Sequence, residues 1–165
     1  MNEITPYIDG NLVYGAGKAV EDTLRSFKNG ELLADNNDIK KSFPAKNDIR
    51  LPYANPPSPR DHVLRPVSRF RRVGNPRTHE NPFLYALQVV WFRYHNYLAR
   101  EVKKSHQNYS DEQIFNAARR LSIAQYQKIV MYEWLPAWLK IDANGNVFNI
   151  REDYPYEGGG KNKYS

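Results

Sequence analysis

The segment from Arg77 to Asn96, RTHENPFLYALQVVWFRYHN, constrains the fold of this chain more than any other stretch. Asn is a favoured N-cap and Pro fits the first helical turn, so Asn81-Pro82 predicts the start of a helix. Arg77 and Glu80 lie directly before that start. The pattern therefore predicts two charged side chains on the entry loop of a rigid element, directed beyond its end.

Apolar periodicity predicts two long helices, at residues 82–104 and 110–135. Ser110 and Gln113 have the spacing of a capping box, and Pro136 is expected to end the second helix. A connection of about five residues predicts antiparallel neighbours, and hence a mainly α fold. The apolar positions of the first helix are Phe83, Leu87, Val90, Trp91, Tyr94, Leu98 and Val102. Those of the second are Ile114, Ala117, Ala118, Leu121, Ala124 and Ile129.

The remaining segments are shorter or irregular. A short helix is expected over 20–27, closed by Asn29-Gly30. Residues 35–76 form a Pro-rich connection, whose Pro56-Pro57-Ser58-Pro59 also fits a polyproline ligand for an SH3 domain. Beyond residue 140, Asn144-Gly145 predicts a small hairpin, and 141–165 is a hairpin with an irregular tail. Residues 142–153 touch the EF-hand pattern, but the glycine is misplaced and a turn is the better interpretation.

Composition excludes several classes of function. The chain has 165 residues, 41% of them hydrophobic, which suffices for one domain with a core. Its net charge of +6 comes from scattered basic residues, a pattern that does not favour nucleic-acid binding. The absence of cysteine excludes disulfide scaffolds and Cys-bound metals. No stretch is apolar enough for a membrane span. Asn108-Tyr109-Ser110 fits the N-glycosylation acceptor, between the two predicted helices.

With RYHN at its end and YEWLP at 132–136, the segment from Arg77 resembles the animal haem peroxidase family, and within it the dual oxidase branch. All twenty positions from Arg77 to Asn96 align with the family pattern without a gap. The resemblance implies that residues 1–140 are part of a mainly α-helical peroxidase domain. It also implies that the chain is an internal fragment of a longer protein.

The resemblance assigns roles to the two charged residues. Arg77 would lie over haem b and stabilise negative charge on the departing oxygen when hydrogen peroxide is cleaved. Glu80 would form an ester to a haem methyl group. Asn81 stands where myeloperoxidase has a methionine, so a sulfonium bond to the haem is excluded. Without the resemblance, Arg77 and Glu80 fit an exposed ion pair near a helix start.

A second constellation lies in residues 4–15. Oxygen-bearing residues at alternate positions of a loop can direct their oxygens at one cation, as Ca²⁺ requires. The resemblance implies a calcium loop in which the ligands are Thr5, the carbonyl of Tyr7, Asp9 and Asn11, the last in place of the family's usual serine. A further aspartate ligand is expected outside this chain.

The histidines are expected to be structural. His95 fits a hydrogen-bonded core residue, and the family gives it that role. The distal and axial histidines of the family are expected in segments outside this chain. None of His62, His79, His95 and His106 is expected to replace them. Core packing is expected for the aromatic residues Trp91, Tyr94, Trp134 and Trp138.

The resemblance also implies the setting. The domain would use hydrogen peroxide to oxidise small donors or halides, on the extracellular side of the plasma membrane. The longer protein would reach the membrane through its other parts and carry FAD and NADPH in a module that makes hydrogen peroxide. The isolated chain is expected to be inactive. The alternative is a non-catalytic interaction domain, since some dual oxidase peroxidase domains lack the haem residues.

Overall fold

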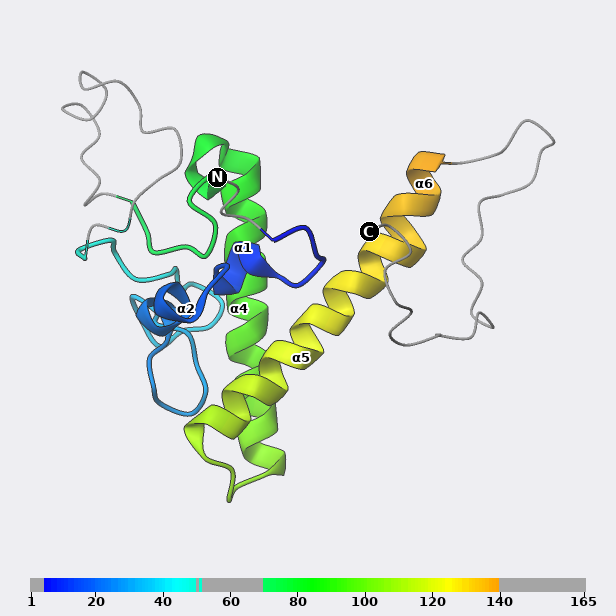
Figure 1. Ribbon diagram of the computed structural model, residues 1–165. Helices are drawn as coiled ribbons and strands as arrows, with labels where there is room; N and C mark the ends of the chain where they lie inside the picture. The colour runs from blue at the N-terminus through cyan, green and yellow to red at the C-terminus, as the bar shows by residue number, and fades with distance from the viewer. Residues whose placement is uncertain (1–4, 50, 52–69, 140–165) are drawn as a thin grey trace, which may run out of the picture. The chain divides into compact units, whose positions relative to one another are not determined.

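The computed structural model describes residues 5–49, 51 and 70–139, and within these ranges it contains helices and irregular segments but no β-strand. The chain divides into two units, residues 1–127 and 128–165. Figure 1 shows the elements, which are α1 (Asn11–Tyr14), α2 (Lys18–Leu24), η2 (Thr78–Glu80), α4 (Pro82–Ser105), α5 (Asp111–Ile129), η3 (Val130–Trp134) and α6 (Leu135–Leu139). The predicted mainly α fold is confirmed.

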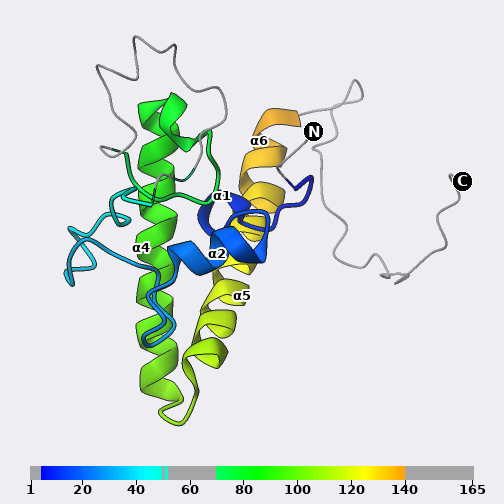
Figure 2. The same ribbon diagram turned by 60° about the vertical axis from the view of Figure 1, so that its left-hand side comes forward.

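The two long helices begin where the sequence predicts. The Asn81 side chain accepts a hydrogen bond from the amide of Phe83 at 2.8 Å, which caps α4. Ser110 N–H donates to Gln113 Oε1 at 2.9 Å, and Gln113 N–H donates to Ser110 Oγ at 3.3 Å, so the capping box is confirmed. A five-residue turn, 106–110, joins α4 to α5, and the helices run in opposite directions from it (Figures 1 and 2).

The predicted core face of α4 is wrong in its first half. Phe83, Leu87 and Val90 are 80%, 58% and 59% exposed. The buried residues are instead Gln88, Val89, Phe92, His95, Asn96, Ala99 and Val102. The reason is that α4 packs against irregular backbone, which needs polar partners. Periodicity identifies an apolar stripe but not what covers it.

Three polar residues of α4 bind that irregular backbone. Asn96 accepts from Leu32 N–H at 2.7 Å and donates to Leu32 O at 3.1 Å, as a neighbouring strand would. His95 Nε2 lies 2.9 Å from Gly30 O, and Arg93 donates to a carbonyl of the same segment, that of Ser42, at 2.7 Å. The RYHN sequence therefore attaches residues 30–42 to the helix.

Gly30 is required at the centre of this arrangement. It has a φ of +66°, and an added Cβ would lie 2.5 Å from the backbone nitrogen of Phe115. Its amide donates to Asp111 Oδ1 at 2.6 Å, while its carbonyl contacts His95. Gly30 therefore links α4 to α5 through hydrogen bonds of its backbone alone. Within the first unit, α1 lies beside α4 in both views (Figures 1 and 2).

The predicted stripe of α5 is also only partly correct. Ile114 and Ala118 are buried with Ala99 and Val102 of α4, but Leu121 and Ala124 are exposed. Phe115 and Ser122 are buried instead, on the side that faces Tyr14 and His95. The buried face of α5 therefore includes a side that packs against Tyr14 of α1, which the predicted stripe does not cover.

Pro136 does not end the helical region. Residues 130–134 form a π-helical turn, in which Leu135 N–H donates to Val130 O, and α6 continues to Leu139. The wider turn restarts the helix so that Pro136 falls in a first turn, where a missing N–H is tolerated. Trp134 and Trp138, expected in a core, are 52% and 74% exposed, whereas Trp91 and Tyr94 are partly buried.

Among the described helices, none has the length and apolarity that crossing a membrane requires. Several predictions from sequence lie outside the described residues. These are the hairpin and tail at 141–165, the EF-hand-like segment 142–153, the Pro-rich centre 56–59 and His62.

Candidate active site

Arg77 and Glu80 lie on one short turn at the end of α4. Arg77 is the residue before η2, and Glu80 is the last residue of η2, with its N–H donating to Arg77 O at 3.0 Å. Both residues are exposed, while Thr78 between them is fully buried. The buried Thr78 anchors the turn, so the two charged residues lie on its outer side. Both charged residues are thus exposed before the start of α4, as the sequence predicts.

The turn is held by α1 through Gly74 and Asn75. A Cβ at Gly74 would lie 2.4 Å from both Asn11 O and Gly15 N, so only glycine allows this approach of two backbones. Asn75 N–H donates to Leu12 O at 3.3 Å. The Asn75 side chain then accepts from Arg77 N–H at 2.9 Å. Arg77 is thus positioned by the segment that also carries the predicted calcium loop.

Asn75 and Gly74 were not identified from the sequence. The available signal was Asn75-Pro76, because Asn before Pro favours the start of a turn. The close approach of Gly74 to α1 has no local signature, since it depends on a segment some sixty positions earlier in the chain.

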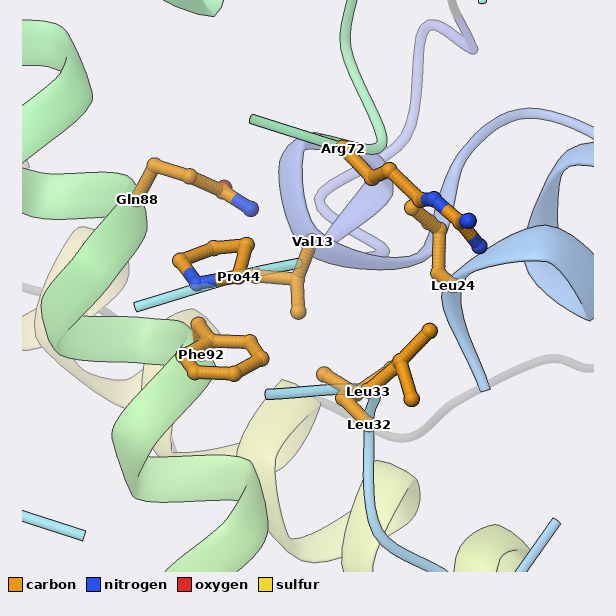
Figure 3. A pocket seen from close by; sticks show the side chains of 8 residues that line it. All are labelled: Val13, Leu24, Leu32, Leu33, Pro44, Arg72, Gln88 and Phe92. Carbon is orange, nitrogen blue, oxygen red and sulfur yellow. The ribbon is translucent and has the colours of Figure 1, made fainter. Parts of the chain in front are cut away.

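The interior of the first unit has no space for a cofactor in the two cavities that lie within its core. One is lined by residues that include Val13, Leu32 and Phe92, whose side chains converge in Figure 3, and measures about 10 Å³. The other, beside Trp91 and Tyr126, also measures about 10 Å³. Such a volume holds one water at most. Neither of these two cavities could therefore hold a large planar cofactor.

The outer face of α4 next to the turn has the character that haem requires. Phe83 and Leu87 are largely exposed within the first two turns of α4, which follows the exposed Arg77 and Glu80. A macrocycle needs apolar contact for its faces and polar groups at its reactive side. The residues present therefore fit one wall of a haem site.

The described histidines His79, His95 and His106 each contact a neighbouring ring or backbone group. His95 is fully buried with both ring nitrogens engaged, Nδ1 by the Tyr14 hydroxyl at 2.9 Å and Nε2 by Gly30 O. His79 stacks on Tyr85 at 4.9 Å, and burial lowers its pKa. His106 stacks on Tyr109 at the opposite end of α4. The structural role predicted for His95 is confirmed.

The predicted calcium loop brings three of its four proposed ligands together. Thr5 Oγ1 donates to Asp9 Oδ2 at 2.7 Å, and Asn11 Nδ2 donates to Thr5 Oγ1 at 3.3 Å. Asn11 N–H donates to Asp9 Oδ1 at 3.0 Å, so the loop closes on the carboxylate. The side chain of Tyr7 is 78% exposed, which is compatible with a role for its carbonyl alone.

The loop offers one carboxylate with neutral oxygen donors. In the described part of the chain, no three His, Asp or Glu side chains gather as a metal site would require. A calcium ion at Thr5–Asn11 would therefore depend on hydroxyl, carbonyl and amide oxygens, and on a ligand from elsewhere.

Comparison with known proteins shows which family the chain belongs to. The animal haem peroxidase family matches residues 1–165. The chain belongs to this family. It is 39% identical over 142 residues to dual oxidase 1 of Caenorhabditis elegans, covering 86% of the chain. It is 36% identical over 139 residues to the dual oxidase of Drosophila melanogaster, covering 84% of the chain.

A solved peroxidase shares the fold of this family member. Peroxidase A from Dictyostelium discoideum superposes on 79% of the chain with a TM-score of 0.69 at 36% identity. A fatty acid alpha-dioxygenase from Arabidopsis thaliana, 21% identical with a TM-score of 0.55, resembles it in fold. The chain spans 9% of the length of the two dual oxidases and 24% of the peroxidase. A haem peroxidase site would thus be completed by residues beyond this chain.

Proposed function

We propose that this chain is part of the peroxidase domain of a dual oxidase, in which hydrogen peroxide oxidises a small reducing donor or a halide. One observation carries the proposal. Arg77 and Glu80 are exposed on an anchored turn, beside an apolar helix face, in a chain that is 39% identical to a dual oxidase over most of its length.

Arg77 is the proposed catalytic residue. Haem, when bound, supplies the iron at which hydrogen peroxide is reduced. The Arg77 guanidinium would stabilise the negative charge that develops on the departing oxygen, because it stays protonated and presents a planar set of donors. Its fixed backbone, through the Asn75 hydrogen bond at 2.9 Å, supports this role by limiting the movement of the side chain's base.

Glu80 is the proposed attachment point of the cofactor. Its carboxylate would form an ester to a haem methyl group and so hold the ring next to Arg77. The position after it is Asn81, whose side chain is used as the helix cap. A sulfonium attachment at that position is chemically excluded.

The Thr5–Asn11 loop is the proposed calcium site, with ligands from Thr5, the Tyr7 carbonyl, Asp9 and Asn11. Calcium there would stiffen the segment that precedes α1. Because α1 contacts Gly74 and Asn75, the same ion would support the position of Arg77.

The longer protein would carry FAD and NADPH in a separate module that produces hydrogen peroxide. This domain would lie on the extracellular side of the plasma membrane and reach the membrane only through other parts of the protein. A non-catalytic interaction domain is the second candidate. The presence of both Arg77 and Glu80 on an exposed turn favours the peroxidase.

The test uses the full-length protein that contains this chain, purified after expression with added haem. We expect a Soret band at one haem per peroxidase domain, and oxidation of guaiacol or iodide that requires hydrogen peroxide. A folded protein that binds no haem and oxidises neither donor would contradict the proposal and favour the interaction domain.

A further inference from the structure

The turn between α4 and α5 presents an acceptor sequence for N-linked sugar. Residues 106–110 are all exposed, and Asn108-Tyr109-Ser110 lies within them. The turn is held by its backbone: Tyr109 N–H donates to His106 O at 3.1 Å, and Lys103 Nζ donates to Gln107 O at 2.8 Å. Among the described residues, the Asn108 side chain has no hydrogen-bond partner. Its amide is therefore open to solvent and has no structural role in the fold.

We propose that Asn108 is an N-glycosylation site. In the transfer, Asn108 Nδ2 attacks the anomeric carbon of an oligosaccharide carried on a lipid diphosphate. The new C–N bond forms as the C–O bond to the diphosphate breaks, the amide loses one proton, and the lipid diphosphate leaves with the bonding electrons. No redox partner is needed.

The fold accommodates the sugar without losing its helix cap. Ser110 supplies the hydroxyl that the acceptor sequence requires, and the same hydroxyl accepts from Gln113 N–H in the folded capping box. Transfer therefore takes place before the turn closes, while Ser110 is still available. Afterwards the sugar is attached to Asn108 alone, and Ser110 remains free to cap α5.

The sugar would also be remote from the candidate active site. Helix α4 has 24 residues and spans about 36 Å, with Glu80 before its first residue and the turn after its last. The polar surface of the turn is suited to hydration of a sugar. Glycosylation at Asn108 would therefore protect and solubilise the far end of the helix pair without blocking Arg77 and Glu80.

The inference rests on the proposed function in one respect, because the domain must enter the secretory lumen. The full-length protein is expressed in animal cells, and the peptide containing residue 108 is analysed by mass spectrometry with and without N-glycosidase. We expect a glycan on Asn108 that the enzyme removes with conversion to aspartate. Asn108→Gln should abolish it.

Two substitutions of Ser110, the third residue of the acceptor sequence, separate its role in glycosylation from its role as the N-cap of α5. Ser110→Thr preserves both the hydroxyl that the acceptor sequence requires and an N-cap residue, so the glycan should remain. Ser110→Asp preserves a preferred N-cap but removes the acceptor, so the glycan should be lost while helix content and thermal midpoint of unfolding stay unchanged. A glycan that persists in Ser110→Asp would show that it lies on another residue.

A reporter site distinguishes the failure of this inference from that of the proposed function. Asp38→Thr creates an acceptor at the exposed Asn36, in the same unit of the chain. If Asn36 is modified and Asn108 is not, the inference at Asn108 is wrong and the extracellular location stands. If neither Asn36 nor Asn108 is modified, the domain does not enter the lumen. That result would overturn both the glycosylation of Asn108 and the extracellular location.

Discussion

At the scale of single residues, Arg77 and His95 use ionisable side chains in opposite ways. Arg77 is exposed. His95 is fully buried, and desolvation lowers its pKa to about 4, so it is neutral at physiological pH. Burial also raises the pKa of Tyr14, which keeps its hydroxyl protonated and able to donate to His95 Nδ1. His95 Nε2–H is then free to donate to Gly30 O.

This arrangement predicts that acid destabilises the fold. Because the folded-state pKa of His95 lies below its ordinary 6.5, the unfolded chain takes up a proton first as pH falls. The stabilisation is complete above pH 6.5 and is lost between pH 6.5 and 4. Between pH 7 and 5, we expect the free energy of unfolding to fall by about 2 kcal/mol from this residue, measured by urea titration.

The control for that measurement is His95→Gln, which cannot titrate. Its stability should be lower than that of the wild type at pH 7, since buried partners lose a hydrogen bond, by about 1–3 kcal/mol. Its dependence on pH between 7 and 5 should be smaller. Equal pH dependence in both proteins would show that His95 is not the group responsible.

Glu80 is predicted to attach the haem covalently in the full-length protein. Glu80→Gln keeps the size of the side chain and removes the carboxylate that forms the ester, so more haem should be released by acidic organic solvent after peroxide treatment. Glu101→Gln, a change at a partly exposed residue near the other end of α4, serves as the matched control. If the wild type already releases all of its haem, Glu80 forms no ester.

At the scale of elements, the sequence predicts where each helix begins better than which side of the helix is buried. Asn81 and the Ser110–Gln113 pair specify local hydrogen bonds, which are encoded within a few residues of each other. The exposure of Phe83 and Leu87 is not encoded locally, because it depends on which segments cover α4. The sequence alone also does not predict that the helical region continues past Pro136. The π-helical turn before Pro136 places this residue in the first turn of α6.

The candidate site follows the same division. Arg77 and Glu80 are identified as site residues through the resemblance of the segment 77–96 to the family, because their position before a helix start alone fits an exposed ion pair. The roles of Gly74 and Asn75 in holding that turn depend on contact with α1, whose residues lie far away in the sequence. Tertiary contacts of this kind leave no periodic signal.

The Thr5–Asn11 loop is predicted to couple calcium to stability. In the full-length protein, chelation should lower the thermal midpoint of unfolding, since a ligand at 100 times its Kd contributes about 2.7 kcal/mol. Asp9→Asn removes the loop's carboxylate and should lower the midpoint in calcium and reduce its response to chelation. Asp22→Asn, in the nearby α2, should respond to chelation as the wild type does. An identical response in Asp9→Asn would exclude this loop as the site.

At the scale of the whole molecule, we propose that this chain provides one wall of a site. Two cavities within its core measure about 10 Å³ each, His95 is engaged in the core, and His106 lies at the far end of α4. The apolar face at Phe83, Leu87 and Val90 is exposed beside the charged turn. These features are expected of a part whose complement is supplied by the rest of a peroxidase domain.

The chain alone should therefore bind haem weakly. Haemin titrated into the purified 165-residue chain should give no stoichiometric complex with a histidine-ligated Soret spectrum. Lysozyme, a protein without a haem site, provides a comparison for nonspecific association. A tight complex at one haem per chain, with such a spectrum, would show that the chain contains an iron ligand and a closed pocket of its own.

The most direct test of the account is the reaction of the full-length protein with hydrogen peroxide after Arg77→Leu. Stopped-flow absorbance of the haem should show a reaction slower by about two orders of magnitude or more, with haem still bound, because only the charge that stabilises the departing oxygen is lost. Arg120→Leu, an exposed arginine on α5, should react at the wild-type rate. An unchanged rate in Arg77→Leu would contradict the assignment of this turn to the catalytic site.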